Sequence, residues 1–305
     1  MRRVLVTGAS GFVGRAVLDA LAREDAEVVA LARRPPPAAP RPRLSWRAAD
    51  MLDAAALRAA VAEARCDACI HLAWDVGPGY WTSASNLDWL AASATLLRAF
   101  QEAGGTRFVG AGTCAEHDWT TIGEAPLRED APRRPATPYG AAKSALWDVA
   151  AAHGAASGLE VAWGVVFHVI GPGERAGRLL PSIVAALDAG REAACTAGTQ
   201  VQDPIDVRDL GAAFARLALS TLRGRVNLGG GAPTSVAEIA RRVDARCGRP
   251  GLLRLGALPP RAGEPARLVP DLSRLHGALG FVPRHDLDES IAAAVDWQRA
   301  HGAAA

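Results

Sequence analysis

Thr7-Gly8-Ala9-Ser10-Gly11-Phe12-Val13-Gly14 joins the apolar run Val4–Val6 to a helical stretch over Arg15–Arg23. Its three glycines allow a tight turn, close approach of a pyrophosphate to the backbone, and close packing of the helix on the strand. Free N–H groups and the helix dipole favour anions at a helix N-terminus. The motif therefore predicts a dinucleotide site formed by Gly8, Ser10, Gly11, Phe12, Val13 and Gly14.

Short apolar runs alternate with helical stretches through the first half of the chain. This alternation is typical of βαβ units, and it predicts an α/β fold with a Rossmann-type, doubly wound parallel sheet. The expected strands are Val4–Val6, Glu27–Leu31, Cys69–Ala73, Arg107–Ala111 and Val161–Val169. The expected helices are Arg15–Arg23, Ala54–Ala64 with Asp53 as its N-cap, Asn86–Ala103 and Pro138–His153.

The regular pattern loosens after about residue 166, where Gly171-Pro172-Gly173 marks a turn and prolines recur. We expect a smaller C-terminal α/β domain there, lying over the carboxyl edge of the sheet, where open α/β sheets bind ligands. The expected cofactor domain comprises residues 1–165 and about 203–222, and the expected substrate-binding domain comprises 166–202 and about 223–305.

Composition excludes several other classes of protein. The 305 residues are 50% hydrophobic and 22% charged, with a net charge of +2, which gives no basic field for nucleic acid or a membrane surface. No apolar run is long enough to span a bilayer, and we expect no signal peptide, because the first strand is predicted to begin within the first few residues. Cys66 and Cys69 form a CxxC without a second ligand pair, so we expect no metal and a cytoplasmic protein with reduced thiols.

The end of the second strand bears on which dinucleotide is bound. NAD sites usually place an acidic residue there to bind the ribose 2′-OH, whereas this chain has Ala32 followed by Arg33 and Arg34. A guanidinium suits a 2′-phosphate, so the sequence favours NADP over NAD. The alternative is that both arginines only face solvent.

Tyr139-Gly140-Ala141-Ala142-Lys143 contains one of the two tyrosines and the only lysine; every other basic residue is arginine. A lysine retained against that bias suggests a role that a planar guanidinium cannot fill. Positions i and i+4 share a helical face, and a nearby ammonium is expected to lower the pKa of the phenol so that it can exchange a proton. The alternative is a solvated surface lysine.

With the glycine motif and YxxxK together, the chain resembles the extended branch of the short-chain dehydrogenase/reductase superfamily, which contains nucleotide-sugar epimerases, dehydratases and reductases. The resemblance runs essentially end to end. The matching segments are Asp50-Met51, His71-Leu72-Ala73, Phe108–Thr113, Trp163–Phe167, Gly171–Glu174, Asp203–Asp209 and Arg261–Pro265.

The resemblance implies roles for individual residues. Thr113, Tyr139 and Lys143 would form the catalytic set. The cofactor would also be bound by Asp50 and Met51 at the adenine and by Leu72, Ala73, Trp74, Lys143 and His168. The expected substrate-binding residues are Trp74, Cys114, Arg178, Gln202 and Arg261, with Tyr80 and Trp81 as further walls of the sugar pocket. The alternatives are packing roles for the aromatic residues, for His168 and for the Cys114 thiol.

Departures from the family pattern narrow the reaction. Dehydratases follow the catalytic threonine with Asp-Glu, whereas Thr113 is followed by Cys114-Ala115. Reductases that also epimerise carry a cysteine at the position of Ala115 and a downstream histidine, and Gly171–Pro181 contains no histidine. Gln202 stands where the family has an arginine for the substrate diphosphate, and Arg178 is a possible replacement.

These features lead to a ranked hypothesis. We expect NADP-dependent reduction of a nucleotide-activated keto-sugar, most simply a nucleoside-diphosphate 4-keto-6-deoxyhexose, with Tyr139 as general acid. The alternatives are a nucleotide-sugar 4-epimerase with tightly held NAD and a non-catalytic nucleotide-binding protein. By resemblance, the helices around Asn86–Phe100 and Pro138–His153 would form the interface of a homodimer.

Overall fold

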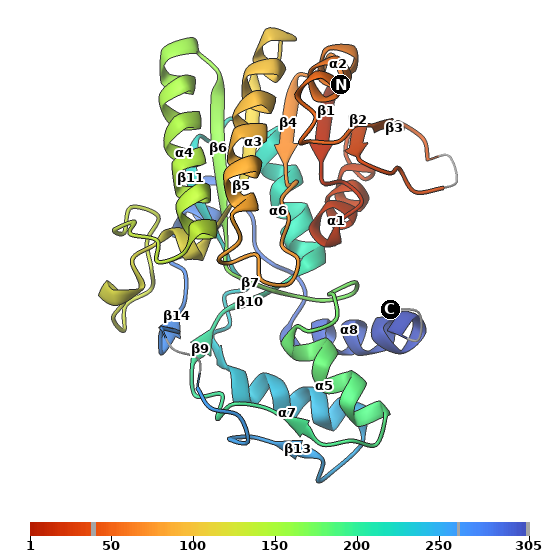
Figure 1. Ribbon diagram of the computed structural model, residues 1–305, viewed down its shortest axis with the longest axis vertical. Helices are drawn as coiled ribbons and strands as arrows, with labels where there is room; N and C mark the ends of the chain where they lie inside the picture. The colour runs from red at the N-terminus through yellow and green to blue at the C-terminus, as the bar shows by residue number, and fades with distance from the viewer. Residues whose placement is uncertain (38–40, 261–262, 303–305) are drawn as a thin grey trace.

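A seven-stranded sheet forms the centre of the computed structural model, which describes residues 1–37, 41–260 and 263–302 (Figure 1). All six pairings between its neighbouring strands are parallel. In spatial order the strands are β11 (Gly224–Leu228), β6 (Glu160–Val166), β5 (Arg107–Thr113), β4 (Ala68–His71), β1 (Arg2–Thr7), β2 (Ala26–Ala32) and β3 (Leu44–Ala48).

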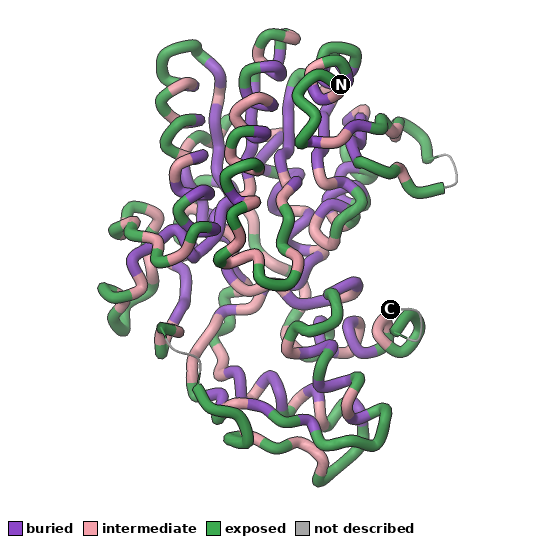
Figure 2. Tube along the Cα trace, in the orientation of Figure 1, coloured by how far each residue is buried: buried purple, intermediate pink, exposed green. Residues whose placement is uncertain are grey.

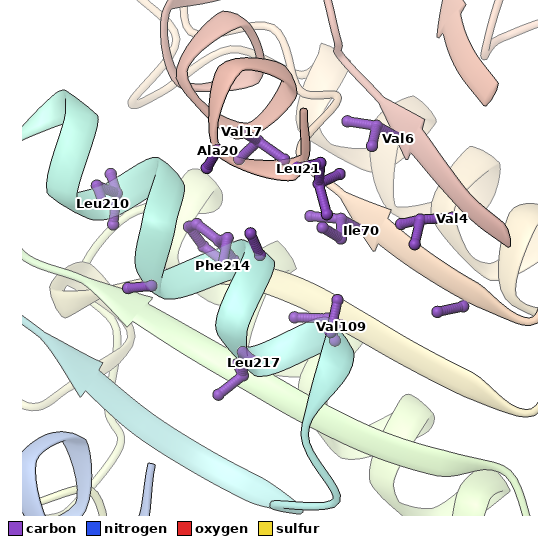
Figure 3. Close-up of a cluster of buried hydrophobic side chains, with 14 of the residues drawn as sticks. Val4, Val6, Val17, Ala20, Leu21, Ile70, Val109, Leu210, Phe214 and Leu217 are labelled. Carbon is purple, nitrogen blue, oxygen red and sulfur yellow. The ribbon is translucent and has the colours of Figure 1, made fainter. Parts of the chain in front are cut away.

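Helices cover both faces of the sheet because successive side chains of each strand point to opposite faces. In β1, Val4 and Val6 pack with α1 (Phe12–Leu21) and α6 (Val207–Leu219), and Figure 3 shows this core. Leu5, between them, joins the core of the other face. That face is covered by α2 (Ala54–Ala64), α3 (Ser85–Glu102) and α4 (Pro138–Ser157).

This strand order is that of a doubly wound Rossmann fold, which confirms the predicted fold class. The order reverses between β1 and β4, and ligands of such sheets bind outside the carboxyl ends of the strands at this point. Asp53 accepts hydrogen bonds from the amides of Ala55 and Ala56 and so caps α2 as expected.

Three strands differ from the sequence expectation. β3 is not among the expected strands, although Leu44 and Trp46 alternate with exposed Ser45 and Arg47 and pack against the core. The expected strand Val161–Val169 divides at Phe167, and its second part, β7 (His168–Ile170), leaves the main sheet to pair with β10 (Pro204–Asp206). β11 pairs with β6 in the main sheet although it lies beyond the expected domain boundary near residue 222. The division of the chain into a cofactor domain and a substrate domain stays a prediction.

A second group of elements lies beyond the carboxyl ends of the main strands (Figure 1). Its helices α5 (Leu179–Asp188), α7 (Val236–Cys247) and α8 (Leu287–His301) share a separate hydrophobic core, visible as the lower buried segments of Figure 2. The short strands are β8 (Ala193–Ala194) paired with β13 (Leu253–Arg254), and β9 (Val201–Gln202) paired with β12 (Thr234–Ser235) and β14 (Arg267–Leu268). The remaining turns of helix are η1 (Cys114–Glu116), η2 (Trp119–Thr121) and η3 (Arg274–Ala278).

Within the three described stretches of the chain, no helix combines the length and the apolar character that crossing a membrane requires.

Candidate active site

The turn between β1 and α1 depends on glycines at two close approaches. Gly8 has a φ of +67°, and a Cβ there would lie 2.8 Å from the backbone nitrogen of Ala73. A Cβ on Gly14 would lie 2.1 Å from the Gly8 carbonyl oxygen. The turn is closed by the Gly11 amide, which donates to the Gly8 carbonyl at 3.0 Å. The sequence motif therefore folds into the tight strand-turn-helix that close approach of a pyrophosphate needs.

The N-terminus of α1 is open to a ligand. Its N-cap residue, Gly11, offers no side-chain cap, and Ser10 and Gly11 are exposed while Phe12 and Val13 are half-buried. The first amides of the helix are thus available to an anion, and the helix dipole favours one. This geometry fits the diphosphate of a dinucleotide.

His71 ties this turn to the helix layer. Its Nδ1 lies 2.8 Å from the Thr7 hydroxyl and its Nε2 2.8 Å from the Ser93 hydroxyl. Ser93 donates to the Trp89 carbonyl and Thr7 accepts from the Ala73 amide, which assigns the remaining proton to His71 Nε2. Burial lowers the pKa of His71 to about 3, so the ring is neutral and structural. Its network positions Leu72 and Ala73 against the glycine turn.

The residues expected around the adenosine lie at the ends of β2 and β3. Ala32 is buried and pairs with Ala48, while Arg33 and Arg34 are exposed directly after it. Met51 is buried, and the Asp50 carboxylate accepts from the Leu52 amide at 3.0 Å. The segments that the sequence assigned to this end of the cofactor are therefore neighbours in the fold.

The structure brings Thr113, Tyr139 and Lys143 together. Thr113 is the last residue of β5; its hydroxyl accepts from the Ala115 amide at 3.3 Å and is close enough to Tyr139 to lower the pKa of the phenol. Tyr139 and Lys143 lie one turn apart near the start of α4, which Thr137 caps through the Gly140 amide. The three side chains come from two elements that meet at the carboxyl edge of the sheet.

Lys143 is buried rather than solvated. Its Nζ donates to the Ala111 carbonyl at 3.0 Å and lies 4.0 Å from the centre of the Trp74 ring, a favourable cation–π geometry. Burial lowers the pKa of Lys143 to about 7, and the negative charge of Glu116 opposes that shift. The surface-lysine alternative is therefore wrong.

The pKa of Tyr139 shifts in the direction opposite to the predicted one. Burial raises the pKa of Tyr139, Tyr80 adds to that rise, and hydrogen bonding to Thr113 is the effect that lowers it. The ammonium is instead directed at the Ala111 carbonyl and the Trp74 face. The phenol consequently holds its proton at neutral pH, the form that a general acid needs.

Aromatic side chains enclose Tyr139. The rings of Tyr80, Trp81 and Trp74 meet it edge to face, with centroids at 4.9, 5.5 and 6.3 Å. Asn86 holds this segment, because its amide donates to the Tyr80 carbonyl at 2.7 Å and accepts from the Trp74 indole at 2.9 Å. The aromatic residues singled out in the sequence thus gather in one place, where they pack on Tyr139.

Glu116 and Arg225 are absent from the sequence prediction. Glu116 is fully buried in η1 and forms an ion pair of 2.5 Å with Arg225, which is itself buried in β11. Glu116 also accepts from the Thr113 amide at 2.9 Å while Thr113 caps η1, a reciprocal capping box. The spacing Thr113-x-x-Glu116 is the sequence signal that would have identified Glu116.

The residues expected to bind substrate fall into two groups. Arg178 precedes α5, lies 3.6 Å from the buried Glu174 carboxylate and lowers the pKa of Tyr80 by charge and hydrogen bonding, so it lies near the aromatic wall. Cys114 is buried there, and burial raises the pKa of its thiol to about 12. Gln202 lies farther along the chain in β9, and Arg261 lies outside the described residues.

His168 lies at the start of β7 with its Nδ1 buried and without a hydrogen-bond partner in the described protein. Burial and the charge of Arg178 lower the pKa of His168 to about 4, so the ring is neutral at physiological pH. A buried ring nitrogen without a partner is a group that a bound ligand would satisfy.

Known proteins with a similar sequence or fold include nucleotide-sugar enzymes. The model of the NAD dependent epimerase/dehydratase family matches residues 4–229. UDP-glucose 4-epimerase of Azospirillum brasilense is 31% identical, over 97% of this chain and 92% of its own length. The dTDP-4-dehydro-6-deoxy-D-allose reductase of Streptomyces bikiniensis is 35% identical over 44% of this chain and 42% of its own. The structure of Thermus thermophilus UDP-glucose 4-epimerase with NAD has a TM-score of 0.85 at 25% identity, covering 98% of this chain and 99% of that one.

The chain therefore belongs to the NAD dependent epimerase/dehydratase family, and its fold is that of the extended short-chain dehydrogenase/reductases it resembles. This places the chain in the class of NAD(P)-dependent enzymes that modify nucleotide sugars.

Proposed function

We propose that this protein is an NADP-dependent reductase of a nucleoside-diphosphate 4-keto-6-deoxyhexose. The observation that carries the proposal is the grouping of Thr113, Tyr139 and Lys143 at the carboxyl edge of the sheet without an acidic residue directly after Thr113. Cys114 and Ala115 stand where a dehydratase needs an acid and a base, so the set supports hydride transfer without removal of water.

The side chains have complementary roles in carbonyl reduction. Thr113, whose hydroxyl oxygen accepts from the Ala115 amide, would turn its O–H from the Tyr139 oxygen to the substrate carbonyl. Tyr139 then delivers its proton to that oxygen as negative charge develops, since burial keeps the phenol protonated. When bound, a reduced nicotinamide would supply the hydride. Lys143 fixes the end of β5 through Ala111 and offers its remaining N–H groups to a ribose.

NADP is favoured at the adenosine end. Ala32 is buried and has no group to bind a ribose 2′-OH, whereas Arg33 and Arg34 are exposed beside it and match a 2′-phosphate. The diphosphate would lie at the open N-terminus of α1. NAD remains the alternative cofactor.

For the substrate, Arg178 is proposed to bind the diphosphate in place of the arginine that Gln202 replaces, together with Arg261. Trp74, Tyr80 and Trp81 would wall the sugar, with Cys114 beside them. A homodimer through the exposed faces of α3 and α4 stays a prediction, which sedimentation equilibrium decides.

A sugar-nucleotide 4-epimerase is the second candidate, because the relatives that match nearly the whole chain include a UDP-glucose 4-epimerase. An epimerase returns the hydride to the opposite face of the sugar, so it has no net need for NADPH. Purified protein that carries stoichiometric NAD and interconverts two sugar nucleotides would establish this second function.

The test of the proposal is NADPH oxidation on addition of deoxythymidine- or uridine-diphosphate 4-keto-6-deoxyglucose. We expect turnover by the wild type and a loss of about 10²–10⁴-fold in Tyr139→Phe, the range for removal of a general acid. Cofactor affinity, measured by quenching of tryptophan fluorescence, should be unchanged in the variant. Absence of oxidation with every such sugar would reject the reductase.

A further inference from the structure

Glu116 is a buried carboxylate whose position the proposed reaction does not explain. It has no exposed surface, yet three groups from three elements bind it. Its Oε1 accepts from the Thr113 amide at 2.9 Å and from the Trp163 indole at 3.0 Å, and its Oε2 forms the ion pair with Arg225. Burying a charge is costly unless it is paired and hydrogen-bonded, so a carboxylate held in this way has a specific place in the fold.

The carboxylate and the Lys143 ammonium bind neighbouring groups of one short backbone segment. Lys143 binds the Ala111 carbonyl and Glu116 binds the Thr113 amide, two residues farther along β5. Gly112 lies between them, and a Cβ there would come within 2.1 Å of the Trp163 indole nitrogen and 2.6 Å of Glu116 Oε1. The end of β5, which carries the Thr113 hydroxyl, is therefore clamped by a buried cation and a buried anion.

We propose that Glu116 is a positioning residue of the candidate active site, which anchors the Thr113 backbone and faces the Lys143 ammonium with a buried negative charge. This assignment rests on the proposed function for its catalytic meaning. Its physical content, an electrostatic coupling between two buried groups, can be measured without a substrate.

The titratable groups around Lys143 and Glu116 determine the direction in which Glu116 shifts the pKa of Lys143. Lys143 is faced by neutral His71 from β4, by Glu116 from η1 and by protonated Tyr139 from its own helix. Glu116 is the negative charge among them that raises the pKa of Lys143 against the effect of burial. On the far side of the carboxylate, Arg225 binds Oε2 and lies 3.3 Å from the neutral His117 ring.

The composition of the chain makes the coupling directly measurable. Lys143 is the only lysine, so protein labelled with ¹³C,¹⁵N-lysine gives a single lysine side chain whose chemical shifts report its titration. In Glu116→Gln the amide oxygen still accepts from Thr113 while the charge is removed. We expect the pKa of Lys143 to fall by about one unit or more in this variant, since an opposite charge nearby shifts a pKa by about 1–3 units.

A second variant disturbs Glu116 from its other side, and a third controls for the loss of an ion pair. Arg225→Gln removes the cation that pairs with the Glu116 carboxylate, so the pKa of Lys143 should change in this variant as well; this variant also keeps the test decisive if Glu116→Gln does not fold. Glu160→Gln breaks the ion pair with buried Arg107 at the amino end of the same strands, and it should leave the titration of Lys143 unchanged. An unchanged lysine pKa in both Glu116→Gln and Arg225→Gln would overturn the assignment.

The two proposals fail in different ways. If no keto-sugar is reduced but the pKa of Lys143 moves as expected, the reductase is wrong and the coupling stands. If the sugar is reduced, the alkaline limb of the pH profile of kcat/KM should move downward in Glu116→Gln by the same amount as the lysine pKa. A reductase whose pH profile and lysine titration are both indifferent to Glu116 would leave the carboxylate with a purely structural role.

Discussion

The two ends of the candidate active site are built on different physical principles. The cofactor end, at β1, is made by backbone: glycines bring the chain within van der Waals contact of itself and leave the amides of α1 exposed. The catalytic end, at β5, is made by side chains: Lys143, Glu116 and Tyr139 are all buried, and Lys143 and Glu116 hold the end of β5 by hydrogen bonds to the Ala111 carbonyl and the Thr113 amide. Substitutions at the cofactor end should therefore act through steric overlap. Substitutions at the catalytic end should act through lost charge interactions and misplaced side chains.

The largest loss of stability and cofactor binding is expected when a methyl group is added to the glycine turn at the cofactor end. In Gly8→Ala, the left-handed φ of +67° and the contact with the Ala73 backbone should together lower the free energy of unfolding by about 2–5 kcal/mol. Cofactor binding should be lost as well. Denaturant unfolding and a fluorescence titration with NADPH measure the two effects.

Gly158→Ala is the matched control, because Gly158 has a φ of +79° at the end of α4 and a Cβ there would meet nothing within 4 Å. Gly158→Ala should lower the free energy of unfolding by only about 1–2 kcal/mol, the cost of a left-handed backbone conformation, and should leave cofactor affinity intact. Equal losses in both variants would show that close backbone approach is not what makes Gly8 necessary.

The catalytic end should respond to a change that preserves charge. Lys143→Arg keeps the cation but replaces a compact ammonium, fixed between the Ala111 carbonyl and the Trp74 ring, with a wide planar fork. We expect kcat/KM to fall by about 100-fold, the scale of a misplacement of about 1 Å, together with weaker cofactor binding. Steady-state kinetics and the NADPH titration check this.

Lys143→Met separates shape from charge, since it fills similar space without an ammonium. If Lys143→Arg works as well as the wild type while Lys143→Met is inactive, charge alone is what the site requires. The special role of the single lysine would then be refuted.

The same contrast explains how much the sequence could reveal. The glycine turn is local: eight consecutive residues specify the strand, the turn and the helix, and the doubly wound fold follows from the alternation around them. Thr113, Tyr139 and Lys143 are recognisable because i, i+4 spacing and a family pattern place them. The sequence does not separate β7 from β6, because the apolar run continues through Phe167, where the chain turns out of the sheet.

The remaining features depend on contacts between distant parts of the chain. Glu116 and Arg225 are 109 positions apart, and nothing in either segment shows that they meet. The predicted direction of the Tyr139 pKa shift is wrong because spacing alone gives no measure of burial, which outweighs the neighbouring charges. Local capping chemistry is readable from the sequence, whereas the electrostatic environment of the site is not.

The smallest effect is expected at the exposed rim of the cofactor end, where neither close packing nor burial is involved. Arg33→Ser removes an exposed guanidinium beside Ala32, so NADPH should bind about tenfold more weakly, a loss of about 1.4 kcal/mol, while the affinity for NADH and the stability stay the same. Arg23→Ser, which changes an exposed arginine just past α1, is the control for net charge and should change neither affinity.

The double variant Arg33→Ser/Arg34→Ser should approach equal affinity for the two cofactors, because the remaining site touches only groups that NADPH and NADH share. An undiminished preference for NADPH in that double variant would show that the 2′-phosphate is bound elsewhere, and a wild type that prefers NADH would refute the NADP assignment while leaving the glycine turn as the site of the shared diphosphate.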